Sequence, residues 1–146
     1  MRADRLILSL LFVGPLLLGG CATGGYAENG RIGWAKEALD ASIASRSVVR
    51  VRILRTKSAV GMICSGPMVF QSVRGDQSFE ASSKMAARVE RGYIRVGSRT
   101  FSYDVIVKPK NAGDFLKING KRYRGFVQLR RGGRGILEVI EHVKID

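Results

Sequence analysis

Residues 115–123 read Phe-Leu-Lys-Ile-Asn-Gly-Lys-Arg-Tyr and hold the strongest hairpin signal in the chain. Asn119 and Gly120 both tolerate a positive φ, which a tight two-residue turn requires. Apolar and polar residues alternate on each side of this pair, as they do in a strand with one buried face. The stretch therefore predicts two antiparallel strands that join at Asn119-Gly120.

The same period of two extends outward from this hairpin in both directions. Gly132 to Gly135 read as a turn, whereas residues 77–92 are polar and weakly periodic and are expected to form a loop or an irregular strand. Short strands with frequent turns predict a mainly β domain, a small antiparallel sandwich or barrel. The expected strands are residues 47–54, 59–64, 68–73, a hairpin over 93–107 around Gly97-Ser98, 115–129 and 136–145.

One short helix is expected before the strands. Apolar residues recur at near-helical spacing within residues 31–46, as in an amphipathic helix that packs on a domain. Asn29 or Gly30 is the candidate for its N-terminal cap. The expected fold is therefore a mainly β domain with one short N-terminal helix.

Residues 1–20 differ from the rest and read MRADRLILSLLFVGPLLLGG. Two arginines precede an apolar run that is too short to span a membrane but fits the core of a secretory signal. Leu18-Gly19-Gly20-Cys21 resembles the lipobox of bacterial lipoproteins, in which a lipid is attached to the cysteine and the chain is cut before it. An ordinary signal peptide with a chance cysteine is the alternative.

The lipobox resemblance implies lipidation of Cys21 and a lipid-anchored protein of the bacterial cell envelope. Ala22 follows the cysteine, and in such lipoproteins the absence of Asp at this position goes with the periplasmic face of the outer membrane, if the host has two membranes. The expected division is a signal peptide over 1–20, a lipidated cysteine, linker and short helix over 21–47, and a β domain over 48–146.

The chain is strongly basic, with 25 Lys and Arg against 12 Asp and Glu and a formal net charge of +13. Removing residues 1–20 takes away two arginines and one aspartate, so the remainder keeps a net charge of +12. The charge is therefore a property of the domain. A small domain this basic is expected to meet an anion, such as nucleic acid, acidic lipid or a cell wall rich in carboxylates.

The residue types that carry metal and acid–base chemistry are scarce. His142 is the only histidine and is expected to face solvent, and Cys64 lies in an apolar run that predicts a buried thiol. Cysteine–histidine metal sites are excluded by count, so no cofactor is expected. Glu138 and Glu141 are three apart on the last expected strand, which places them on opposite faces rather than in a catalytic pair. The sequence yields no catalytic residue.

Basic residues gather in the last third of the chain and flank aromatic residues. Basic strands with interleaved aromatics are typical of single-stranded nucleic-acid binding, and a solvated sheet face is the alternative interpretation. Export disfavours a nucleic-acid partner, so none is expected, and a glycan with peptide carboxylates suits the charge better. The candidate glycan-binding residues are Lys121, Arg122, Tyr123 and Arg124.

Residues 48–146 resemble the first half of the SpoIID/LytB domain. The resemblance rests on Val49 to Leu54, on residues 115–129 with Ile118-Asn119-Gly120-Lys121 and Tyr123-Arg124-Gly125, and on the final strand. That family includes a lytic transglycosylase of sporulation, which cleaves peptidoglycan glycan strands, and an enhancer of cell-wall amidases. Its catalytic glutamate lies on a helix after the last strand seen here, and no residue of this sequence matches it.

This resemblance leads to two hypotheses. In the first, residues 48–146 are the front part of an envelope glycan-cleaving enzyme whose catalytic half is missing from this sequence. In the second, the chain is a non-catalytic lipoprotein that binds peptidoglycan or a partner wall enzyme such as an amidase. An exported binder of nucleic acid or acidic lipid is a third and less favoured reading. An open frame that continues past codon 146 into a helix bearing a glutamate would support the enzyme.

Overall fold

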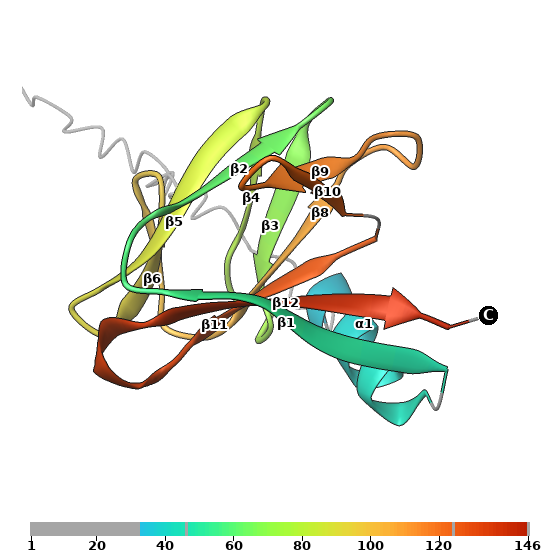
Figure 1. The fold of residues 1–146 in the computed structure, drawn as a ribbon, viewed down its shortest axis with the longest axis horizontal. Helices are drawn as coiled ribbons and strands as arrows, with labels where there is room; N and C mark the ends of the chain where they lie inside the picture. Colours follow the sequence, from blue (N-terminus) through green and yellow to red (C-terminus); the bar gives the residue numbers. More distant parts are fainter. Residues whose placement is uncertain (1–32, 46, 124, 146) are drawn as a thin grey trace, which may run out of the picture. The chain divides into compact units, whose positions relative to one another are not determined.

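A computed structural model describes residues 33–45, 47–123 and 125–145 of the chain. Arg124 and residues 1–32, which include Cys21 and the expected signal and linker, lie outside the described residues. The described part contains one helix, twelve strands and one short 3₁₀ turn (Figure 1). The elements are α1 (Trp34–Ala44), β1 (Val48–Thr56), β2 (Val60–Cys64), β3 (Met68–Ser72), β4 (Ser78–Ala81), β5 (Lys84–Glu90), β6 (Tyr93–Val96), β7 (Arg99–Phe101), β8 (Val105–Pro109), β9 (Leu116–Ile118), β10 (Lys121–Tyr123), β11 (Val127–Arg131), η1 (Gly133–Gly135) and β12 (Leu137–Lys144).

The strands form two six-stranded antiparallel sheets. The first sheet has the order β1-β12-β11-β8-β3-β4, and the second has the order β10-β9-β2-β5-β6-β7. The last strand of the chain, β12, therefore lies inside the first sheet, between β1 and β11. The prediction of a mainly β antiparallel sandwich with one short helix is confirmed.

One hydrophobic core lies between the two sheets. Phe70 and Leu129 of the first sheet and Met62 and Ile94 of the second are at most 1% exposed and belong to one cluster of buried side chains. Phe79 stacks on Phe70 with the ring centroids 4.8 Å apart, which extends this core to the edge strand β4. Because side chains alternate along a strand, each sheet also has an outer face that points away from the core.

Helix α1 covers part of the outer face of the first sheet (Figure 1). The backbone N–H of Ala35 donates to Oε1 of Gln71 on β3 at 2.8 Å. Ser42, at the other end of the helix, hydrogen-bonds to His142 on β12. The helix lies within the expected range of residues 31–46, and two polar contacts fix it to the sheet.

The hairpin that dominates the sequence is present as β9 and β10. Asn119 and Gly120 have φ angles of 49° and 81°, and Ile118 pairs with Lys121 across the turn. Both central residues of the turn lie in the left-handed region, as the Asn-Gly pair predicts. This turn fixes the register of the whole hairpin.

The structure corrects the expectation for residues 77–92. In place of a loop or an irregular strand they form two regular strands, β4, which pairs with β3, and β5, which pairs with β2 and β6. Ala87 of β5 is fully buried and Met85 and Val89 pack against the core, whereas Ala86 is exposed. Because alanine occurs on both faces of this strand, the contrast in hydropathy is too low for the period to stand out.

The chain changes sheets in two places where continuous strands were expected. Within residues 93–107, β6 and β7 form the expected hairpin in the second sheet, but β8 belongs to the first sheet. Residues 123–129 are likewise divided between β10 of the second sheet and β11 of the first. These two crossings, which correct the sequence-based strand bounds, bring basic residues that are close in sequence onto different sheets.

Candidate anion-binding surface

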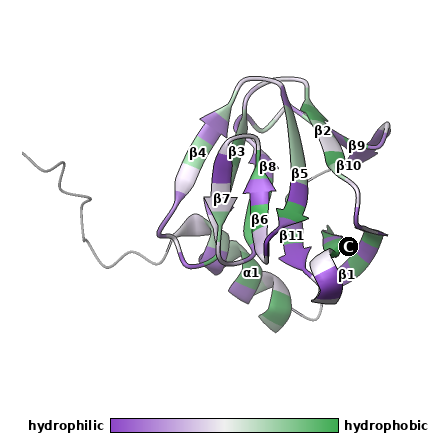
Figure 2. Cartoon of the chain, turned by 90° about the vertical axis from the view of Figure 1, so that its left-hand side faces the viewer, coloured by the Kyte–Doolittle hydropathy of each residue, from purple (hydrophilic) through white to green (hydrophobic). Residues whose placement is uncertain are grey.

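The outer face of the second sheet is built by strict alternation. On β2, Met62 and Cys64 are at most 3% exposed, whereas Gly61 and Ile63 between them are exposed. The predicted burial of Cys64 is thereby confirmed. Figure 2 shows hydrophobic and hydrophilic segments following one another along the strands of this sheet, for example in β5. The core takes one set of side chains, and the other set faces outward.

Four outward-facing residues form a row across four neighbouring strands. Arg122 of β10 pairs with Lys117 of β9, and Lys117 also pairs with Ile63 of β2. Ile63 in turn pairs with Lys84 of β5. We refer to Arg122, Lys117, Ile63 and Lys84 as the basic row. At about 4.8 Å between strands, the row extends over roughly 14 Å.

The three cations of the basic row have no acidic partner among the described residues. Instead, the Cζ atom of Arg122 lies 4.1 Å and the Nζ atom of Lys117 lies 5.6 Å from the ring centroid of Phe115. The ring face attracts both cations and favours their proximity despite their mutual repulsion. The row therefore presents positive charge that is not neutralised within the described part of the chain.

The surface next to the basic row is open because the adjacent positions carry little side chain. Gly61 pairs with Ala86, and no atom lies within 4 Å of the place where a Cβ of Gly61 would stand. A ligand strand can therefore approach the backbone of β2 and β5 closely. A shallow hollow of about 180 Å³ adjoins this area, lined by Ala59, Ala86, Arg88, Arg95 and Gly97.

Arg88 and Arg95, on the far side of this hollow, share one carboxylate. Oε2 of Glu90 lies 2.8 Å from Nη1 of Arg95 and 3.2 Å from Nη2 of Arg88. The hydrogen bond from Arg95 and the weaker effect of Arg88 hold the pKa of Glu90 below its usual range. Because one carboxylate offsets half of their charge, these two arginines add less to anion binding than the basic row.

The four predicted glycan-binding residues do not form one surface. Arg122 belongs to the basic row. Lys121 and Tyr123 pair with core residues of β9 and therefore lie on the opposite face of β10. Arg124 lies outside the described residues. Strand alternation separates side chains that are consecutive in sequence, so the run of basic residues is not a basic patch.

Three residues of the basic row were not among the candidate site residues predicted from the sequence, namely Ile63, Lys84 and Lys117. Of these, only the position of Lys117 could be inferred from the sequence, because the Asn119-Gly120 turn sets the register that places Lys117 opposite Arg122. The positions of Ile63 and Lys84 depend on which strands become neighbours. A single sequence gives no such pairing.

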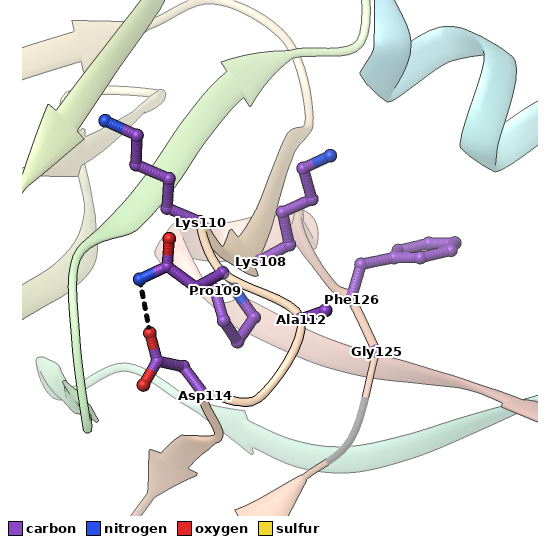
Figure 3. Close-up of a pocket in the computed structure, with 8 residues that line it drawn as sticks. Lys108, Pro109, Lys110, Ala112, Asp114, Gly125 and Phe126 are labelled. Carbon is purple, nitrogen blue, oxygen red and sulfur yellow. Dashed lines mark hydrogen bonds between the residues drawn. The ribbon is translucent and has the colours of Figure 1, made fainter.

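A larger pocket of about 360 Å³ lies between the β8–β9 connection and the segment before β11 (Figure 3). Its polar side chains already have partners. Asn111 donates to Oδ2 of Asp114 at 2.9 Å, as drawn in Figure 3, and Lys110 forms an ion pair with a glutamate of β4. Nζ of Lys108 lies 4.1 Å from the ring centroid of Trp34. This pocket therefore leaves few polar groups available to a ligand.

His142 is buried beneath α1, so the prediction that it faces solvent is wrong. The residue is 6% exposed, and its Nδ1 atom is bonded to the hydroxyl of Ser42. Its Nε2 atom lies 3.0 Å from Oε1 of Gln128, whose amide donates to Asp104 at 2.7 Å. These contacts fit a neutral ring that accepts at Nδ1 and donates from Nε2. Burial, followed by the charge of Arg50, lowers the pKa of His142 to about 4.

This buried hydrogen-bonded network, which connects Ser42, His142, Gln128 and Asp104, is structural and is not a nucleophilic site. Ser42 is 6% exposed, so its oxygen does not face a cavity that admits a substrate. Gln128 separates the imidazole from Asp104, whose pKa is raised chiefly by burial. The three hydrogen bonds instead connect α1 to β12, β11 and the segment before β8.

The two glutamates of β12 lie on opposite faces of the first sheet, as predicted. Glu138 is on the outer face, where hydrogen bonds from Arg130 hold its pKa below the usual range. Glu141 pairs with the buried Val127 and lies on the core side, where burial raises its pKa. The sheet between them prevents the two carboxylates from acting on one bond.

The described residues contain neither a metal-binding cluster nor a membrane-spanning helix. Nowhere in residues 33–45, 47–123 and 125–145 do three His, Cys, Asp or Glu side chains gather as they would around a metal ion. The one helix in this part of the chain, α1, lacks the length and apolar character needed to cross a membrane.

No protein-family model, curated protein or solved structure matches the chain.

Proposed function

We propose that the protein is a lipid-anchored protein of the bacterial cell envelope that binds peptidoglycan through the basic row of the second sheet. The lipobox-like Leu18-Gly19-Gly20-Cys21 supports anchoring through Cys21, at the periplasmic face of the outer membrane if the host has two membranes. Anchored there, the domain would meet the cell wall rather than nucleic acid. A cell-wall amidase is the proposed protein partner.

The observation that carries this proposal is the register that places Arg122, Lys117 and Lys84 in one row across the sheet, with Ile63 between the two lysines. Peptidoglycan strands carry carboxylates at regular intervals, and a row of cations without acidic partners complements them. The open strip over Gly61 lets an extended strand lie close to the sheet. The surface suits a long polyanion better than a small ligand.

The resemblance to the SpoIID/LytB domain supports the same target. Residues 115–123, which carry its most specific markers, form the β9–β10 hairpin and contribute Lys117 and Arg122 to the basic row. Three glutamates of the strands favour binding over cleavage, because Glu138 and Glu90 are held by arginines and Glu141 stands apart. We therefore propose a non-catalytic role in wall binding or remodelling for the sequence in hand.

Gly61→Glu is expected to weaken binding of the protein to purified peptidoglycan sacculi about tenfold. The new side chain would enter open space, and its carboxylate would lie among the cations of the basic row and repel the wall. The measurement is co-sedimentation of the full-length chain, extracted in non-ionic detergent, with increasing amounts of sacculi at low salt.

Two matched variants accompany this experiment. Gly61→Ser adds a small neutral side chain at the same place, and Gly133→Glu adds the same charge at a turn of the first sheet, also with no atom within 4 Å of the new Cβ. Both are expected to bind within about twofold of the unmodified chain. Unchanged binding by Gly61→Glu, or an equal loss in Gly133→Glu, would contradict the assignment of this surface.

A further inference from the structure

Three arginines converge on one glutamate on the outer face of the first sheet. Oε2 of Glu138 accepts hydrogen bonds from Nε and Nη2 of Arg130 at 2.9 and 2.6 Å. Oε1 accepts one from Nη1 of Arg52 at 3.2 Å and lies 3.6 Å from Nε of Arg55. We refer to Arg52, Arg55 and Arg130 as the arginine cluster. Its three positive charges meet one negative charge, so a net charge of +2 remains.

A register irregularity in β1 creates this cluster. Arg55 and Arg130 both pair with Glu138, so the three residues form a row across β1, β12 and β11. Arg52 pairs with Ile140, and the register shifts between Arg52 and Leu54. In a regular strand, residues three apart point to opposite faces, whereas the extra residue lets Arg52 and Arg55 share the outer face. Irregularities of this kind are common where a side chain is redirected towards a site.

The cluster is oriented but remains accessible. The side chain of Glu138 is 8% exposed, whereas those of the three arginines are between 46% and 55% exposed. Helix α1 covers the other end of β1 and β12 (Figure 1). Figure 2 shows the end of β11 that carries Arg130 as strongly hydrophilic. The carboxylate thus fixes one side of each guanidinium and leaves the other side open to solvent.

Most of the hydrogen-bonding capacity of the cluster is unused. Three guanidinium groups provide about fifteen N–H donors, and only three hydrogen bonds to Glu138 are formed. Guanidinium forks match the oxygens of phosphate in geometry, and a net charge of +2 matches a phosphate dianion. We propose that the arginine cluster binds a phosphate group, as a site separate from the basic row and on the opposite side of the sandwich.

Inorganic pyrophosphate is the first probe for this site. The full-length chain in non-ionic detergent is expected to bind it saturably at low salt, with shifts of the Arg52, Arg55 and Arg130 Nε–Hε resonances in ¹H–¹⁵N spectra. Arg52→Gln and Arg55→Gln are each expected to weaken the affinity about tenfold, because each removes charge-assisted hydrogen bonds to the anion.

Arg88→Gln is the matched control, because Arg88 is also a half-exposed arginine paired with one glutamate, but on the second sheet. It is expected to leave pyrophosphate binding unchanged.

The lipid headgroup glycerophosphoglycerol is the second probe. Binding as tight as that of pyrophosphate, despite the single charge of the diester, would assign the site to phospholipid, and weaker binding would assign it to phosphate groups with terminal oxygens. Absence of saturable binding to both probes, or an equal loss in Arg88→Gln, would overturn the proposal without affecting the peptidoglycan assignment.

Discussion

Lowering the pH from 7 to 4 is expected to lower the free energy of unfolding by about 2 kcal/mol through His142 alone. The pKa of this ring is about 4 in the folded chain against an ordinary value of 6.5. Between these two values the unfolded chain binds a proton that the folded chain does not bind. The stabilisation is therefore fully present above pH 6.5 and is lost as the pH falls towards 4.

The size of this effect follows from the separation of the two pKa values. Each unit of separation between the two pKa values is worth about 1.4 kcal/mol, which gives an upper bound of about 3–4 kcal/mol, and solvent screening near Arg50 reduces it. Other groups change the slope below pH 5. The lowered pKa of Glu138 adds to the loss, whereas the raised pKa values of Asp104 and Glu141 oppose it. The interval from pH 6.5 to 5 therefore isolates the histidine best.

Urea unfolding at several pH values measures this effect, with the fluorescence of Trp34 as the signal. Trp34 is the only tryptophan of the chain and lies in α1, the helix that the histidine network holds. His142→Gln removes the titrating group and is expected to flatten the pH dependence between pH 6.5 and 5. Equal slopes in this variant and the unmodified chain would contradict the assignment.

Removal of the three cations of the basic row is expected to weaken binding to sacculi about 100-fold at low salt. The variant carries Lys84→Gln, Lys117→Gln and Arg122→Gln, and each lost charge costs about 1 kcal/mol near an anionic surface. The remaining affinity is also expected to depend less on salt. Co-sedimentation with sacculi from about 20 to about 300 mM salt, over which the Debye length falls from roughly 20 to roughly 6 Å, measures both effects.

The control for this variant removes three cations elsewhere. Lys36→Gln, Arg74→Gln and Lys110→Gln change the net charge equally but lie on α1, the β3–β4 turn and the connection after β8. This second variant is expected to lose no more than about threefold, which reflects the overall field alone. If both triple variants lose the same affinity, the binding depends on net charge and the basic row has no special role.

Local sequence features were sufficient to predict the fold class but not the arrangement of the strands. The Asn119-Gly120 turn is a local property of the sequence, because both residues tolerate the positive φ angles that they adopt in the turn. By contrast, β5 was not recognised, since Ala86 faces solvent while Ala87 is buried. The changes of sheet after β7 and β10 depend on closure of the core, which is not a local property.

The candidate site was less predictable than the fold for the same reason. Lys121, Arg122 and Tyr123 look like one patch in sequence, but alternation sends Arg122 to one face and its neighbours to the other. Ile63 and Lys84, which complete the basic row, come from β2 and β5, whose adjacency arises only in the folded sheet. The burial of His142 was not predicted for the same reason, because the sequence of β12 does not indicate that α1 covers its outer face.

Binding of peptidoglycan through the basic row is tested most sharply by a map of the residues that contact the glycan strand. Backbone ¹H–¹⁵N spectra of the full-length protein in detergent, titrated with soluble glycan strands, would supply it. The largest shifts are expected at Ile63, Lys84, Lys117 and Arg122, with little change along β1, β11 and β12. Shifts confined to the first sheet, or none at saturating strand concentrations, would contradict binding through the basic row.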